Sequence, residues 1–216
     1  YNCWCGLTQN PNAIEILSKN TKKIHWTVLA RNPNAIKILE ERLEQYNFAM
    51  QYSIIDWSML SENLNTIKIF ENNINVIDWS MLSTNSNAIE LLENNIYIID
   101  WIFLSGNPNA IRLLENNLNK INWQCLSGNP NAIHLLENNL DKVDWYELSK
   151  NPNAIHLIKN NLDKINWSML SINPNAIQLL DLNKINWAFL SINPNAIDLL
   201  KNNQDEIDWY YLSSNP

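Results

Sequence analysis

Tryptophan recurs along this chain at a nearly fixed interval, and this spacing constrains the fold more than any other feature. Most neighbouring tryptophans are 22 residues apart, with one gap of 31 and one of 20 in the 216-residue chain. A fixed period of this size is typical of a repeat array, in which each copy packs on the next. The ten positions are Trp4, Trp26, Trp57, Trp79, Trp101, Trp123, Trp145, Trp167, Trp187 and Trp209.

The unit that repeats is best seen in residues 101–122, WIFLSGNPNAIRLLENNLNKIN. Its consensus is W-x-x-L-S-x-N-P-N-A-I-x-L-L-x-N-N-L-x-K-I-D/N, and the copies at 63–65 and 85–87 read NLN and NSN in place of NPN. The unit 26–56 carries nine extra residues, and the unit 167–186 is two residues short. We therefore expect residues 1–216 to form a single repeat array, and we expect it to be a fragment of a longer one.

The second half of each unit predicts a short helix. Asn107 is a strong N-cap residue, and Pro108 fits the first helical position because the amide there has no partner in a helix. Apolar residues then recur at i, i+3 and i+4 over 110–114. The Asn116-Asn117 pair is expected to stop the helix, because Asn tolerates the left-handed conformation that often follows a helix.

The first half of each unit predicts a second helix of one or two turns. Asp100 precedes Trp101 and is a suitable N-cap for a helix that carries the tryptophan and the leucine three residues later. Seven other repeats have an acidic residue or asparagine at this position: Asp56, Asp78, Asn122, Asp144, Asn166, Asn186 and Asp208.

The predicted fold is therefore an all-α tandem-repeat solenoid with two short helices per 22-residue unit. Such short helices are marginal alone, so we expect Trp, Leu, Ala and Ile of successive units to build one continuous core. The alternative is a solenoid like that of leucine-rich repeats, whose period includes 22 residues. The stretch 95–104, NIYIIDWIFL, has the strand-forming composition that this alternative needs.

The W-x-x-L-S-x-N-P-N-A-I-x-L-L-x-N-N pattern resembles the tandem 22-residue NPNAI-type repeats found in proteins of giant DNA viruses, and it covers essentially the whole chain. The resemblance implies a viral repeat array located in the host cytoplasm or in the virion, and it brings no catalytic residues with it. The first residues, YNCWCGLTQN, lack the features of a secretion signal, so secretion is not expected.

Charge and composition exclude several classes of function. The chain has a net charge of −7 and only 17% charged residues, and a protein that binds phosphate backbones would need clustered Lys and Arg. Nucleic acid is therefore not expected as a partner. A membrane span is not expected either, because no apolar run is long enough to cross a membrane. Three cysteines make no disulfide framework.

Two rows of opposite charge run along the repeats. The basic row, Lys120, Lys142, Lys164 and Lys184, is expected to pair across repeats with the acidic row, Glu71, Glu93, Glu115 and Glu137.

Positions that differ between copies mark the surface that could recognise a partner. The residue after Ile of NPNAI is such a position, and its members form the candidate partner-binding row, Glu90, Arg112, His134, His156 and Gln178. The insertion adds a candidate apolar contact made by Phe48, Met50 and Tyr52. A metal shared by His134 and His156 is not expected, because equivalent residues of stacked helices lie about 8–10 Å apart.

The repeating residues argue against an enzyme, since no acid, base or nucleophile is unique in the way that a catalytic group must be. No cofactor and no metal are expected. We predict a non-enzymatic scaffold that binds another protein through its extended repeat face. The alternative is a structural component of a virion or fibre that assembles with other copies through its open ends.

Overall fold

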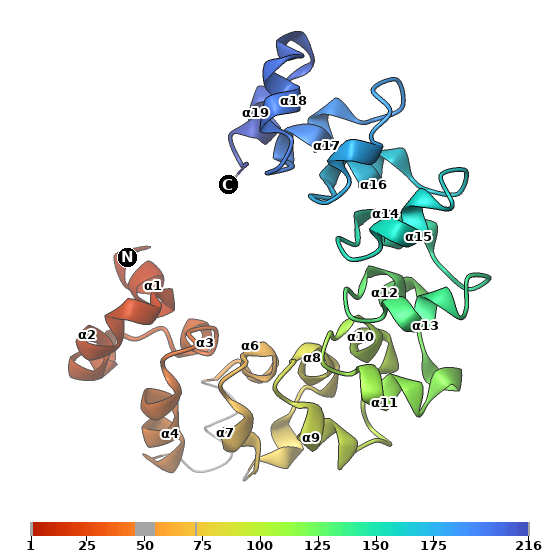
Figure 1. Cartoon of the computed structure of the whole chain (residues 1–216). Coiled ribbons are helices and arrows are strands. Elements are labelled where there is room, and N and C mark those ends of the chain that lie inside the picture. The colour runs from red at the N-terminus through yellow and green to blue at the C-terminus, as the bar shows by residue number, and fades with distance from the viewer. Residues whose placement is uncertain (1, 46–54, 72, 216) are drawn as a thin grey trace. The chain divides into compact units, whose positions relative to one another are not determined.

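The protein is all-helical, as the repeat predicts. The computed structural model describes residues 2–45, 55–71 and 73–215, and within these ranges it contains helices and turns but no strand (Figure 1). The stretch 95–104 was the best candidate for a strand. Residues 95–99 instead form a turn, and the α10 helix begins at Trp101. The leucine-rich-repeat alternative is therefore wrong.

The contacts divide the chain into two compact units, Tyr1–Ala110 and Ile111–Pro216. The prediction of one array over residues 1–216 stays a prediction. The first unit contains α1 (Asn2–Gln9), η1 (Pro11–Ala13), α2 (Ile14–Lys19), η2 (Thr21–Lys23), α3 (Trp26–Leu29), α4 (Ile36–Gln45), α6 (Trp57–Glu62), α7 (Ile67–Glu71), η3 (Ile74–Val76), α8 (Trp79–Thr84), α9 (Ile89–Glu93) and α10 (Trp101–Gly106).

The second unit has the same alternation of elements. It contains α11 (Ile111–Glu115), η4 (Leu118–Lys120), α12 (Trp123–Gly128), α13 (Ile133–Glu137), α14 (Trp145–Lys150), α15 (Ile155–Lys159), α16 (Trp167–Ile172), η5 (Ile177–Leu179), α17 (Trp187–Ile192), α18 (Ile197–Lys201), η6 (Gln204–Glu206) and α19 (Trp209–Leu212).

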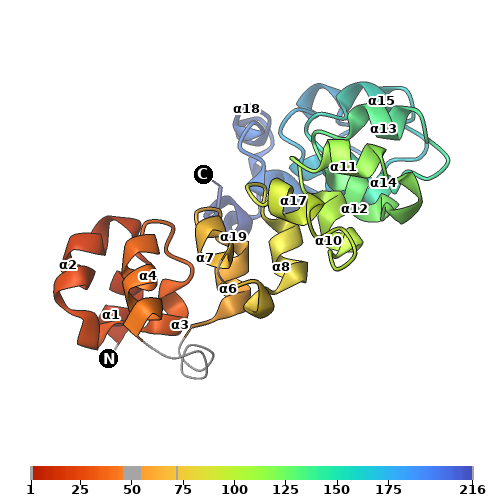
Figure 2. The ribbon, with the colours of Figure 1, turned by 90° about the horizontal axis from the view of Figure 1, so that it is seen from below.

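Each repeat has a first helix, which carries the tryptophan, and a second helix, which starts at or near the isoleucine of NPNAI. Within the first unit, the first helices α3, α6 and α8 follow one another in one row, and the second helices α4, α7 and α9 form another (Figures 1 and 2). Within the second unit, the first helix α14 contacts both α12 and α16. Successive repeats therefore stack like on like, which is how a solenoid builds its core.

The first helices are capped as predicted. Asp144 is typical: its Oδ1 accepts the backbone N–H of Glu147 at 2.9 Å. The same side-chain cap is present at all eight of the positions that the sequence identified, namely Asp56, Asp78, Asp100, Asn122, Asp144, Asn166, Asn186 and Asp208.

The second helices begin later than predicted. Asn107 ends α10, and α11 begins only at Ile111, after a turn closed by the Ala110 N–H on the Asn107 carbonyl at 3.1 Å. The Asn107 side chain still accepts an N–H two residues ahead, from Asn109 at 3.0 Å. The side-chain bond predicted for a helix cap is therefore present, but it stabilises a turn before the helix and does not cap the helix itself. The predicted Asn-Pro helix start is found at Asn10, which caps the 3₁₀ helix Pro11–Ala13.

The Asn-Asn stop uses a different mechanism from the predicted one. No described residue has a positive φ, so the expected left-handed asparagine is wrong. Instead the second asparagine donates its side-chain amide to the carbonyl four residues earlier, as Asn117 does to Leu113 at 2.8 Å. The side chain thus pairs one of the carbonyls that a helix end leaves open.

Within each unit, a row of buried asparagines connects successive repeats. Asn151 lies 1% exposed, and its Nδ2 donates to two carbonyls of the preceding repeat, Ser127 and Asn129, both at 3.0 Å. We call these first asparagines of the NPN motif the asparagine ladder. Members whose bonds follow this pattern are Asn32, Asn63, Asn85, Asn107, Asn151, Asn173, Asn193 and Asn215.

Two further side chains reinforce this connection. The second asparagine of the motif donates to the preceding repeat at the protein surface, as Asn153 does to the Pro130 carbonyl at 2.9 Å. The buried serine after each leucine links forward: Ser127 donates to the Trp123 carbonyl at 2.7 Å and accepts the Asp144 N–H at 3.0 Å. The polar residues of the consensus are therefore largely occupied by bonds that hold the stack together.

The core is formed by the leucines and alanines of the consensus. Leu104, Leu148 and Ala154 are fully buried. The prediction that the tryptophans fill this core is wrong for most of them. Only Trp57 is buried, at 8% exposed, and Trp209 is 67% exposed. The other eight are half-buried.

The two irregular repeats change the second helix, as expected. In the repeat with the insertion, α4 runs for ten residues from Ile36 to Gln45, against five in α11. In the short repeat, which lacks the Asn-Asn pair, the second helix is only the 3₁₀ helix Ile177–Leu179.

Candidate functional site

The candidate partner-binding row lies at the surface. All five of its residues are exposed and occupy the second position of a second helix, with Glu90 in the first unit and the others in the second unit. Its role in binding stays a prediction. The row members are Glu90, Arg112, His134, His156 and Gln178.

The row is paired with acidic residues of the preceding repeat. His134 Nε2 lies 2.7 Å from Glu115 Oε1, and His156 Nε2 contacts Glu137 Oε1 in the same way one repeat later. The acidic row thus pairs with histidines at these two positions, whereas the sequence predicted pairing with lysines. Both contacts are about half exposed, so each stabilises the stack by only about 0–1 kcal/mol.

Three members of the lysine row, Lys142, Lys164 and Lys184, lie over tryptophans instead. Lys142 Nζ is 4.7 Å from the ring centroid of Trp123, and Lys164 Nζ is 5.2 Å from that of Trp145. A cation over an indole face is attracted by the ring quadrupole, and its aliphatic stem covers apolar surface. This explains how these half-buried tryptophans are tolerated. Lys184 over Trp167 and Lys23 over Trp4 repeat the arrangement at 4.9 Å.

Other candidates from the sequence do not form a reactive site. Phe48, Met50 and Tyr52 of the insertion lie outside the described residues. Cys5 and Cys125 are half-buried free thiols. Among residues that the structure places, no three His, Cys, Asp or Glu side chains are grouped so that they could hold a metal ion.

A second variable surface lies on the first helices, and the sequence reasoning missed it. It consists of the third and sixth residues of each repeat, counted from tryptophan, and we call it the first-helix face. The third position holds Gly6, Val28, Met59, Met81, Phe103, Cys125, Glu147, Met169, Phe189 and Tyr211, and the sixth holds Gln9, Arg31, Glu62, Thr84, Gly106, Gly128, Lys150, Ile172, Ile192 and Ser214.

Neighbouring repeats meet on this face, sixth position against third at Gly128 and Glu147 and third against third at Phe189 and Tyr211. Oε2 of Glu147 lies 3.3 Å from the point where a Cβ on Gly128 would stand, so the small residue leaves room for the longer one. The rings of Phe189 and Tyr211 meet edge to face at 6.4 Å between centroids. The chemistry of the face therefore changes from repeat to repeat. The signal that could have revealed it is the same variability that identified the row on the second helices.

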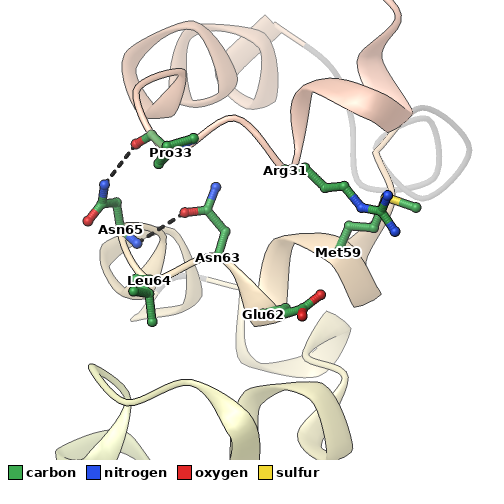
Figure 3. Close-up of a pocket in the computed structure, with 7 residues that line it drawn as sticks. All are labelled: Arg31, Pro33, Met59, Glu62, Asn63, Leu64 and Asn65. Atoms are coloured by element: carbon green, nitrogen blue, oxygen red, sulfur yellow. Dashed lines mark hydrogen bonds between the residues drawn. The ribbon is translucent and has the colours of Figure 1, made fainter. Parts of the chain in front are cut away.

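A hollow lies on the first-helix face of the first unit. It has a volume of about 500 Å³ and lies between the repeats that begin at Trp26 and Trp57 (Figure 3). Arg31 and Glu62 supply opposite charges, while the remaining lining is apolar or amide: Pro33, Met59, Asn63, Leu64 and Asn65.

No helix in the described part of the chain is both long and apolar enough to span a membrane. A scan against protein-family models, a search of curated proteins and a search of solved structures each gave no match. Function is therefore inferred from the residues and their arrangement.

Proposed function

We propose that this protein is a non-enzymatic repeat scaffold that binds another protein through the variable positions of its helices. The observation that supports this most is that the recurring and the variable side chains of the repeat have different roles. The asparagines, serines and capping residues that recur in every repeat form bonds within the stack, as Asn151 and Ser127 do. The residues that differ between repeats lie on the exposed partner-binding row and on the first-helix face, whose members are exposed or half-buried apart from the buried Met169.

A constant frame with a variable surface suits recognition of an extended partner. Because each repeat contributes a few side chains at a fixed spacing, a solenoid presents a long surface on which each partner contact can be chosen separately. Specific interfaces depend on a few such residues rather than on total area. The resemblance to repeats of giant DNA viruses supports a viral setting, with a host or viral protein as the partner.

The experiment compares capture of proteins from lysate by the tagged chain and by matched variants. One variant changes the partner-binding row to alanine, and a second changes three members of the first-helix face to serine, namely the exposed Phe103 and the half-buried Ile172 and Ile192. The control changes exposed charges outside both surfaces to alanine, at Lys22, Asp141, Asp163 and Asp205.

We expect the control to retain the captured proteins and at least one surface variant to lose a specific one, with helical content by circular dichroism unchanged in all. If every protein captured by the original chain is equally captured by both surface variants, the proposal is wrong.

A further inference from the structure

The hollow between the repeats at Trp26 and Trp57 is held open by the asparagine ladder. Asn63 donates to the carbonyls of Ala30 and Asn32 at 2.8 and 3.2 Å. Asn65 donates to the Pro33 carbonyl at 2.9 Å, and its N–H is accepted by Asn63 (Figure 3). These bonds fix the two walls relative to each other, and they occupy the amide donors. The hollow is therefore preformed, and its binding groups are its other side chains.

Two of those side chains carry opposite charges that do not meet. Arg31 and Glu62 occupy the same sixth position in successive repeats, and both are exposed. Neither makes an ion pair with any residue in the described ranges. The situation differs on the first-helix face of the second unit, where Lys150 lies 2.7 Å from Glu147 of its own helix. The hollow thus presents one cation and one anion to whatever enters it.

Apolar groups complete the lining. In Figure 3, Met59 is drawn with Arg31 and Glu62 at one side of the hollow, while Pro33 and Leu64 lie at the other. Leu64 is 47% exposed, in a position where eight repeats have proline. Methionine adapts its shape to different apolar groups. A volume of about 500 Å³ falls within the range of small ligand sites.

We propose that this hollow binds a short linear segment of a partner protein, in which an acidic and a basic side chain flank an apolar one. Arg31 would pair with the acidic side chain, for which a guanidinium offers two parallel hydrogen bonds. Glu62 would pair with the basic one, and Met59 and Leu64 would contact the apolar side chain. This assignment rests on the proposed function, because it names the chemistry of one partner contact.

Charge favours a peptide over a nucleic acid as the occupant. The Glu62 carboxylate would repel a phosphate placed next to Arg31, and the chain as a whole carries a net charge of −7. A segment with both charges satisfies both side chains at once.

The test titrates the full chain with the blocked peptide Ac-Glu-Leu-Lys-NH₂ and follows amide resonances by NMR. We expect saturable shifts at Arg31, Met59, Glu62 and Leu64. Arg31→Gln should weaken binding of this peptide about tenfold, the effect of losing a charged hydrogen bond. The same variant should bind Ac-Gln-Leu-Lys-NH₂ as the original chain does. Glu62→Gln should show the reciprocal pattern with Ac-Glu-Leu-Gln-NH₂.

The control is Lys37→Gln, which removes an exposed charge from α4 of the same repeat and should leave the affinity unchanged. Three results would overturn the proposal: no saturable shifts, equal binding of Ac-Gln-Leu-Gln-NH₂, or binding of free leucine as tight as that of the peptide. Failure of this site would leave the scaffold proposal testable, because the capture experiment changes neither Arg31 nor Glu62.

Discussion

The two compact units protect their tryptophans in different ways. In the second unit, each of Trp123, Trp145 and Trp167 is half-buried and has a lysine of its own repeat over its ring. In the first unit, Lys23 covers Trp4 in the same way, but the ring of Trp26 has Arg42 at 4.5 Å, supplied by the lengthened α4. Trp57 is buried and packs against Phe70, with 6.5 Å between ring centroids.

The comparison shows that the indole face can be covered by a residue other than lysine, as Arg42 covers Trp26. Val76 stands at the lysine position after Trp57 and is itself buried, so a cation there would have to leave water. Where the cover is charged, the tryptophan stays near the surface. Where the surroundings are apolar, it joins the core.

The largest expected effect comes from removing the tryptophan itself. Trp57→Ala should lower the free energy of unfolding by about 3–5 kcal/mol, because it leaves a cavity in the core. Trp145→Ala should cost clearly less, because half of that ring is already at the surface. Urea unfolding of both variants measures the difference. Equal losses would mean that the two units do not differ in the way described.

The asparagine ladder should be equally important in both units. Asn151→Ala removes two donated hydrogen bonds and leaves buried carbonyls without that partner, so we expect a loss of about 2–4 kcal/mol. Asn85→Ala in the first unit should cost the same within about 0.5 kcal/mol. The exposed Asn153→Ala serves as the control and should cost about 1 kcal/mol or less. A loss seen in only one unit would show that the ladder contributes to stability there alone.

The lysine cover should contribute less. Lys164→Ala should lower the free energy of unfolding by about 0.5–1 kcal/mol, the usual contribution of an exposed cation–π contact. Lys23→Ala over Trp4 should have a similar effect in the first unit. Lys159→Ala, an exposed lysine of the same repeat as Lys164, should have almost none. If Lys159→Ala and Lys164→Ala cost the same, the stacking contributes nothing measurable.

The smallest effect concerns the short repeat, which has no counterpart in the first unit. The Asn183 backbone N–H, donated to Asp181 at 3.1 Å, lowers the pKa of that carboxyl, and Lys184 at 3.3 Å adds to the shift. A carboxyl with a lowered pKa stabilises the fold above the ordinary aspartate value of about 3.9, and this contribution is lost as the pH falls through the folded-state value. Asp181→Asn should therefore be slightly less stable than the original chain at pH 7, with the gap in melting temperature closing below about pH 3.

The sequence predicts the features of this fold that depend on local chemistry. Asp144 and its counterparts cap the first helices because a short side-chain acceptor just before a helix lies within reach of the open N–H groups of its first turn. The longer α4 follows from the helix-forming residues 40–45. The apolar spacing of 110–114 correctly indicates which side of the second helix is buried.

The features that failed depend on partners far away in sequence. The ladder role of Asn151 involves carbonyls 22 and 24 residues earlier, so its local capping role was the only one visible. One signal was available. Proline gives way to Leu64 and Ser86 while the asparagine before it stays, and a simple cap would have tolerated serine or aspartate, which lack the amide donor. The sequence analysis did not predict half-buried tryptophans, because the lysines that cover them are far away in sequence. The lysines over Trp123 and Trp145 lie 19 residues further along the chain.

The asparagine ladder also bears on how such a protein can change over generations. Each ladder side chain donates to main-chain carbonyls, as Asn173 does to Ser149 and Asn151, and every amino acid supplies a carbonyl. The bonds between two successive repeats therefore do not depend on which side chains the earlier repeat carries at its surface. Copies can be duplicated, deleted or reordered as modules without redesigning the joint, and mutations can accumulate on the outer positions while the joints persist.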